Sequence, residues 1–127
     1  MRQCGKSGRL WCLTDKMGVM TDAPRVNRVG LMQYDCTFYV GNLPVDATIV
    51  AAGHEPNGYF WEGMLRYLEP DLAEQIELDS EGGMFAAFGR RRQMKRIQGV
   101  LAPYLVDSGL VADTLAAAAR AGFDFDD

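Results

Sequence analysis

The sequence has few of the residues from which active sites and metal centres are usually built. Its 127 residues include one histidine, His54, so a zinc site with several imidazole ligands is excluded. His54 and Glu55 begin a stretch similar to the HExxH motif of metalloproteases, but the fifth position is Gly58. EF-hand, GxSxG, Walker-type and GxGxxG patterns are also missing. We therefore expect no enzyme activity, no metal and no cofactor.

Cysteines and long apolar runs are equally scarce. Cys4, Cys12 and Cys36 are odd in number, and their spacing fits neither a CxxC redox pair nor a zinc framework. We expect free thiols in a reducing compartment. No apolar run approaches the roughly 20 residues needed to cross a bilayer, and the first residues lack the apolar core of a secretory signal. These absences predict a cytoplasmic protein with no membrane association.

Basic residues are nearly missing from the middle of the chain. Residues 35–81 carry ten acidic residues and one basic residue, Arg66, whereas residues 1–28 carry six basic and two acidic residues, a net charge of +4. A folded surface with the acidic imbalance repels nucleic acid and favours a basic partner, although it can also serve solubility alone. The basic run over residues 90–96 is local, and we expect it to decorate a helix and not to bind phosphates.

A chain of this length fits one domain. Residues 1–27 show no apolar period and predict a poorly ordered leader, followed by a single domain over residues 28–127. Met17 and Met20 precede the first regular pattern, which raises the hypothesis that translation begins at one of them. An intact mass that matches initiation at Met1 would end that hypothesis.

The remaining pattern alternates pairs of strands with pairs of helices. The spacing predicts strands over 29–34 and 36–40, as a tight hairpin or one long bent strand, a helix over 45–52, and a helix from the cap Asn57 to Pro70. It then predicts a hairpin of strands 75–79 and 84–88, a helix from Arg90 that Pro103 bends or ends, and a helix capped by Asp107 or Ser108 and ended by Gly122.

This order, ββααββαα, predicts an α+β fold. We expect an antiparallel sheet of about four strands with helices packed mainly on one face. The strand over 84–88, MFAAF, is apolar throughout, which is typical of a central strand covered on both faces.

The densest group of unusual residues is Gly53 to Gly63, GHEPNGYFWEG. It combines the lone histidine, a Pro-Asn-Gly turn and three consecutive aromatic residues. Tyr59, Phe60 and Trp61 fit the buried start of a helix, but Trp and Tyr are also enriched in interface hot spots. The sequence leaves open whether Trp61 lies in the core or at an interface.

Three segments carry a resemblance to a known family. AAGHEPNGYFWEG, LDSEGGMFAAFG and AAAARAGFDFDD resemble the bacterial polymorphic-toxin immunity proteins of the immunity protein 51 family, over about residues 29–127. The resemblance is strongest at HEPNGYFWEG. It implies a protein that protects its own cell by binding a cognate toxin, without catalysis. The acidic bias fits a basic toxin, such as a nuclease.

The residues expected to bind the partner come from the motif and from a neighbouring acidic rim. They are His54, Glu55, Asn57, Tyr59, Trp61 and Glu62 of the motif, and Glu77, Asp79 and Glu81 of the rim. Asn57, Gly58, Phe60 and Gly63 also fit purely structural roles in capping and packing. Two other functions compete with toxin binding, namely a general interaction module with no toxin partner and a small enzyme that uses His54 as an acid or base.

Overall fold

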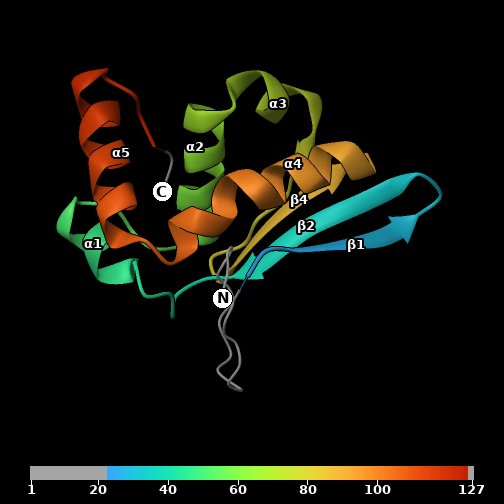
Figure 1. The fold of residues 1–127 in the computed structure, drawn as a ribbon, viewed down its shortest axis with the longest axis horizontal. Coiled ribbons are helices and arrows are strands. Elements are labelled where there is room, and N and C mark those ends of the chain that lie inside the picture. The colour runs from blue at the N-terminus through green and yellow to red at the C-terminus, as the bar shows by residue number, and fades with distance from the viewer. Residues whose placement is uncertain (1–22, 126–127) are drawn as a thin grey trace, which may run out of the picture.

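The computed structural model describes residues 23–125, which form one four-stranded antiparallel sheet and a set of helices (Figure 1). The strands are β1 (Arg25–Gly30), β2 (Gln33–Tyr39), β3 (Glu77–Leu78) and β4 (Met84–Gly89). The helices are α1 (Asp46–Ala51), α2 (Gly58–Leu68), α3 (Pro70–Gln75), α4 (Arg91–Leu101), the 3-10 helix η2 (Ala102–Leu105) and α5 (Ser108–Arg120). The expected α+β class is confirmed, and the order of elements differs by the added helix α3.

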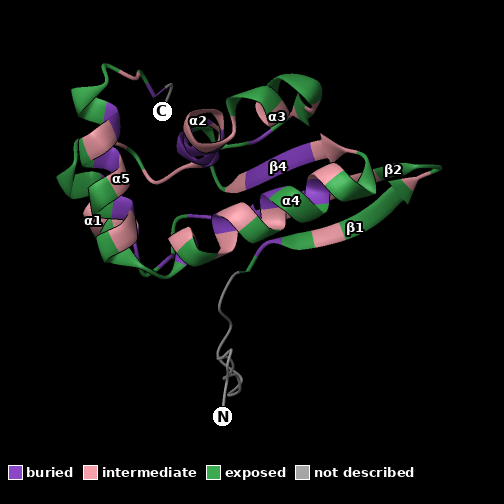
Figure 2. Cartoon of the chain, turned by 45° about the horizontal axis from the view of Figure 1, so that its top comes forward, coloured by how far each residue is buried: buried purple, intermediate pink, exposed green. Residues whose placement is uncertain are grey.

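The sheet has the strand order β1-β2-β4-β3, so β4 is central as predicted. Cys36 pairs with Ala87 and Phe38 with Phe85, and all four side chains are buried. Helices α2 and α4 pack against the sheet, with α4 lying along it (Figure 2). Alternation directs Met84 and Phe88 to the opposite face, and there they are only half-buried by residues 23–125. The face of β4 opposite the helices is therefore only partly covered by residues 23–125, although Ala86 on that face is buried, and cover on both faces stays a prediction.

The first hairpin is confirmed, but its position is shifted. β1 begins at Arg25, inside the expected leader, and the turn lies at Leu31 and Met32, not near Asp35. Asp35 continues β2 and accepts a hydrogen bond from Asn27 on β1 at 3.4 Å. Met32 makes the turn with a positive φ of 58°. Residues other than glycine, asparagine and aspartate rarely adopt this conformation, so the sequence did not indicate a turn at Met32. The predictions for residues 1–22, including both internal start sites, lie outside the described residues.

Pro70 both ends one helix and begins the next. Helix α2 stops at Leu68, as predicted, but Pro70 then occupies the first turn of α3. Proline is favoured there because its missing N–H has no helical partner in any case. Helix α3 extends to Gln75 and leaves only Glu77 and Leu78 for the strand expected over 75–79.

The other predicted helix ends are confirmed by their hydrogen bonds. Asp107 Oδ1 accepts the N–H of Leu110 at 3.0 Å and caps α5, while Gly122 follows that helix with a φ of 75°. Pro103 lies in η2, so the long helix ends in a 3-10 turn. Each such cap contributes about 1 kcal/mol. Within residues 23–125, no single helix is long and apolar enough to cross a membrane.

Candidate functional site

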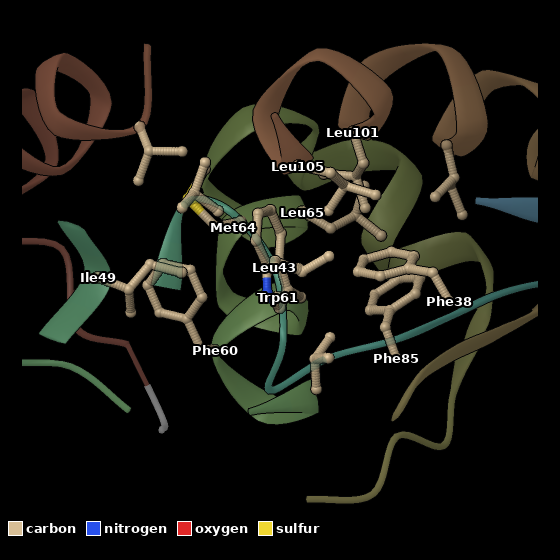
Figure 3. Packing of buried hydrophobic residues seen from close by; sticks show 14 of the residues in the cluster. Phe38, Leu43, Ile49, Phe60, Trp61, Met64, Leu65, Phe85, Leu101 and Leu105 are labelled. Carbon is tan, nitrogen blue, oxygen red and sulfur yellow. The ribbon is translucent and has the colours of Figure 1, made fainter. Parts of the chain in front are cut away.

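The motif divides into a buried half and an exposed half at the start of α2. Phe60 and Trp61 have no exposed surface and lie in the middle of the core (Figure 3). The Trp61 ring packs edge-on against Phe60 and Phe38, with centroid distances of 5.4 and 5.6 Å. Trp61 is therefore a core residue, and the expectation that it contacts a partner is corrected. Tyr59 points outward and keeps 43 % of its surface.

Asn57 and Gly58 fix the start of α2 against the β3–β4 turn. Asn57 Oδ1 caps the helix by accepting the N–H of Phe60 at 2.8 Å, and its Nδ2 donates to Glu55 Oε1 at 3.3 Å. The N–H of Gly58 donates to the carbonyl oxygen of Gly82 at 3.3 Å. A Cβ at Gly58 would lie 2.2 Å from the carbonyl oxygen of Glu81, so only glycine allows this approach.

Glu62 makes a second connection between α2 and the same turn. Its Oε2 accepts the N–H of Ser80 at 2.9 Å, and its Oε1 lies 3.9 Å from Arg66. Ser80 in turn accepts the N–H of Ala86 at 2.9 Å through its hydroxyl oxygen. The carboxylate of Glu62 is thus committed to holding the turn, and it is less available to a partner than the sequence predicted.

These contacts bring the motif and the predicted acidic rim together, although some 20 residues separate them in the chain. Asp79 and Glu81 flank Ser80, which Glu62 holds, and the backbone of Glu81 contacts Gly58. Tyr59 directly follows the same glycine and Glu55 lies three residues before it, and both are exposed. We call the exposed residues Glu55, Tyr59, Asp79 and Glu81 the acidic face. It combines three carboxylates with one aromatic ring and contains no basic residue.

Glu77 lies farther along the sheet. It pairs with Phe88 in the register of β3 and β4, whereas its neighbour Leu78 faces the core. Side chains alternate along a strand, so Glu77 points to the sheet face opposite the helices. It is exposed, and it is not counted in the acidic face because, unlike Asp79 and Glu81, it does not flank Ser80, the residue that Glu62 of α2 contacts.

His54 lies on another side of α2, against the aromatic core. Its ring centroid is 4.8 Å from that of Phe125 and 5.6 Å from that of Phe60. It also lines a shallow groove of about 370 Å³ between α1 and α5, whose other lining residues are Thr48, Ala51, Ala52, Ala112, Leu115, Ala116 and Ala119. The groove is mostly apolar. In this position the imidazole packs as an aromatic side chain at the border between core and surface.

Two residues near the C-terminus were missed as parts of this site. Phe125 stacks on Phe60 with a centroid distance of 5.2 Å, and Phe123 packs edge-on against Phe125 at 5.0 Å. Gly63 makes room for the tail, because a Cβ there would lie 2.6 Å from the Phe125 ring. The signal was present in FDFDD, where aromatic and acidic residues alternate as in a segment with one buried side.

Burial governs the chemistry of the few titratable groups in the interior. Desolvation and the neighbouring Asp35 raise the pKa of the Cys36 thiol to about 12, so it is protonated and unreactive at neutral pH. Desolvation also raises the pKa of Asp46, and the N–H of Leu43 opposes this shift. No group of three or more metal-ligating side chains occurs among residues 23–125.

Comparisons with protein-family models, with curated proteins and with solved structures found no match to this chain.

Proposed function

We propose that this protein neutralises a toxin by binding it, as the resemblance to the immunity protein 51 family implies. The observation that supports the proposal best is the acidic face, because contacts at Gly58 and Glu62 bring the segment of Glu55 and Tyr59 next to the segment of Asp79 and Glu81. An inhibitor needs a rigid, complementary surface and no chemistry of its own. Three exposed carboxylates on these two neighbouring segments favour a basic partner and speed its encounter, and an exposed tyrosine supplies apolar contact area.

The way the acidic face is built also suits a binding surface. The cap at Asn57, the contact at Gly58 and the carboxylate of Glu62 fix its backbone on both segments. A rigid surface loses little conformational entropy when it binds. We infer that Asn57 and Glu62 support the surface and that the four exposed residues contact the toxin.

The direct test is protection of growing cells. The gene next to this one should encode the toxin, and its product is co-expressed with the wild-type protein or with a variant. We expect Glu81→Lys and Tyr59→Ala to lose protection and to weaken binding to the purified toxin. Asp113→Lys is the matched control, because Asp113 is an exposed carboxylate on α5 outside the acidic face.

The outcomes separate the proposal from its rivals. Protection that survives Glu81→Lys and Tyr59→Ala as well as Asp113→Lys would remove the acidic face from the proposal. A wild-type protein that fails to protect against the neighbouring gene product would favour a general interaction module. Turnover of a substrate that disappears in His54→Ala would favour an enzyme. Trp61→Ala is uninformative here, because it removes a core ring and destabilises the fold.

A further inference from the structure

A second charged surface lies at the far end of the sheet, where three arginines border one groove. The groove has a volume of about 360 Å³ and is lined by Arg28, Met32, Tyr34, Arg90 and Arg91. Strand register explains why they meet. Tyr34 on β2 pairs with Arg28 on β1 and with Gly89 on β4, and Arg90 and Arg91 follow directly. The arginines thus come from two different elements and converge on one tyrosine.

The arginines of this groove lack the acidic partners that Arg66 and Arg96 have among residues 23–125. Among residues 23–125, ion pairs join Arg96 to Glu69 and Arg66 to Glu62, and none joins Arg28, Arg90 or Arg91 to a carboxylate. Arg28 makes one hydrogen bond, from its Nε to the carbonyl oxygen of Gly30 at 3.2 Å. The neighbouring contact between α3 and α4 is between two amides, Gln75 and Gln93. The positive charge of the groove is therefore uncompensated within the described part of the chain.

The placement of these charges opposes the local rules of helix stability. Arg90 is the N-cap of α4, Arg91 and Arg92 follow it, and the first turn contains no acidic residue. A helix N-terminus carries a partial positive charge, so acidic residues are stabilising there and basic residues are not. Natural sequences break such rules mainly at functional sites. A bound anion would offset the repulsion between these arginines and the positive end of the helix dipole.

The rest of the groove indicates what kind of anion fits. Tyr34 is half-buried and contributes an aromatic surface, and Met32 adds an exposed, flexible apolar side chain at the turn. Guanidinium groups bind phosphate oxygens through paired hydrogen bonds, and they also stack on flat groups. The volume lies in the range of small-molecule sites. An inorganic ion would contact only the arginines and would leave Tyr34 and Met32 without a ligand group to contact.

We propose that this groove binds a phosphate monoester that carries a flat aromatic group, such as a nucleotide. The phosphate lies between Arg28, Arg90 and Arg91, and the aromatic group lies against Tyr34 and Met32. This differs from the expectation that the run over residues 90–96 only decorates a helix. The groove is separate from the acidic face, and the proposal does not depend on toxin binding.

The test titrates the isotope-labelled full chain with phenyl phosphate, with inorganic phosphate and with adenosine monophosphate, and follows backbone amide shifts by NMR. We expect saturable shifts near Tyr34 and Arg91, and tighter binding of the two aromatic esters than of inorganic phosphate. Arg91→Gln should weaken binding about tenfold or more, since it removes a charged hydrogen-bond donor. Arg120→Gln, an exposed arginine at the end of α5, is the matched control and should leave the affinity unchanged.

Tyr34→Leu tests the aromatic part separately. It should abolish the preference for phenyl phosphate over inorganic phosphate while leaving inorganic phosphate unaffected, and unchanged circular dichroism would show that each variant is folded. If the wild type bound phenyl phosphate and inorganic phosphate with equal affinity, the proposed ligand class would be overturned. Equal weakening by Arg91→Gln and Arg120→Gln would overturn it as well, and so would a response only to a single-stranded oligonucleotide carrying a 5′-phosphate.

Discussion

Replacement of Gly58 by alanine tests the contact on which the acidic face depends. The new Cβ would lie 2.2 Å from the carbonyl oxygen of Glu81 and 2.3 Å from that of Met84. Both atoms belong to the backbone, so no side chain can rotate away. Either the first turn of α2 or the β3–β4 turn must move, and the hydrogen bond from Gly58 to Gly82 is lost with that movement.

The expected magnitude is the sum of three effects. Forced repacking costs about 1 to 3 kcal/mol, and loss of the hydrogen bond costs about 1 kcal/mol. Alanine regains at most about 1 kcal/mol, because it favours helix over glycine. The free energy of unfolding should therefore fall by about 2 kcal/mol, measured by urea unfolding followed by far-ultraviolet circular dichroism.

Gly99→Ala supplies the matched control. Gly99 lies inside α4, is exposed, and has no atom within 4 Å of an added Cβ. The same chemical change should there raise the free energy of unfolding by about 0.5 to 1 kcal/mol. A Gly58→Ala protein as stable as the wild type, alongside a stabilised Gly99→Ala protein, would refute the close approach of α2 to the turn.

Three further predictions follow from the same interior. Phe125→Ala removes the ring stacked on Phe60 and should lower the free energy of unfolding by about 3 kcal/mol, whereas no loss would contradict the docking of the tail. Glu62→Ala removes the acceptor of the Ser80 N–H and should cost about 1 to 2 kcal/mol in urea unfolding, while Glu62→Gln keeps an acceptor and should cost less; equal losses would count against this bond. Cys36, with its pKa raised from 9.0 to about 12, should resist alkylation at pH 8 until the protein unfolds, as mass spectrometry of digested peptides would show; labelling of the folded protein would contradict its burial. The thiol ionises at a lower pH in the unfolded protein than in the folded protein. Its contribution to the free energy of unfolding is therefore fully present below about pH 9 and is lost as the pH rises toward 12.

The sequence predicted the elements whose signals are local. Asn57 and Asp107 are standard caps, and their helices begin beside them. Alternation and turn residues located the second hairpin, although α3 shortened its outer strand. The first hairpin turn was misplaced, because Leu31 and Met32 are not typical turn residues and Met32 adopts a positive φ.

The candidate site depended on contacts between distant segments, which periodicity does not reveal. The motif and the acidic rim were found separately, and they are brought together by the approach of Gly58 to Glu81 and by the hydrogen bond from Ser80 to Glu62. Trp61 could not be assigned, because a helix start next to a turn can place an aromatic ring on either side. Its burial follows from Phe38 on β2, whose position relative to α2 is a property of the whole fold. The arginine groove likewise requires the register that places Arg28 beside Tyr34.

The stacking of Phe125 on Phe60 has a consequence for synthesis of the protein. Phe60 emerges from the ribosome long before Phe125, so the nascent chain lacks the ring that stacks on Phe60 until Phe125 has emerged. His54, which packs against both rings, acquires its final surroundings only at that moment. We expect the surface around the motif to mature only after Phe125 has been synthesised, and a molecule truncated before Phe125 to be a target for chaperones and proteases.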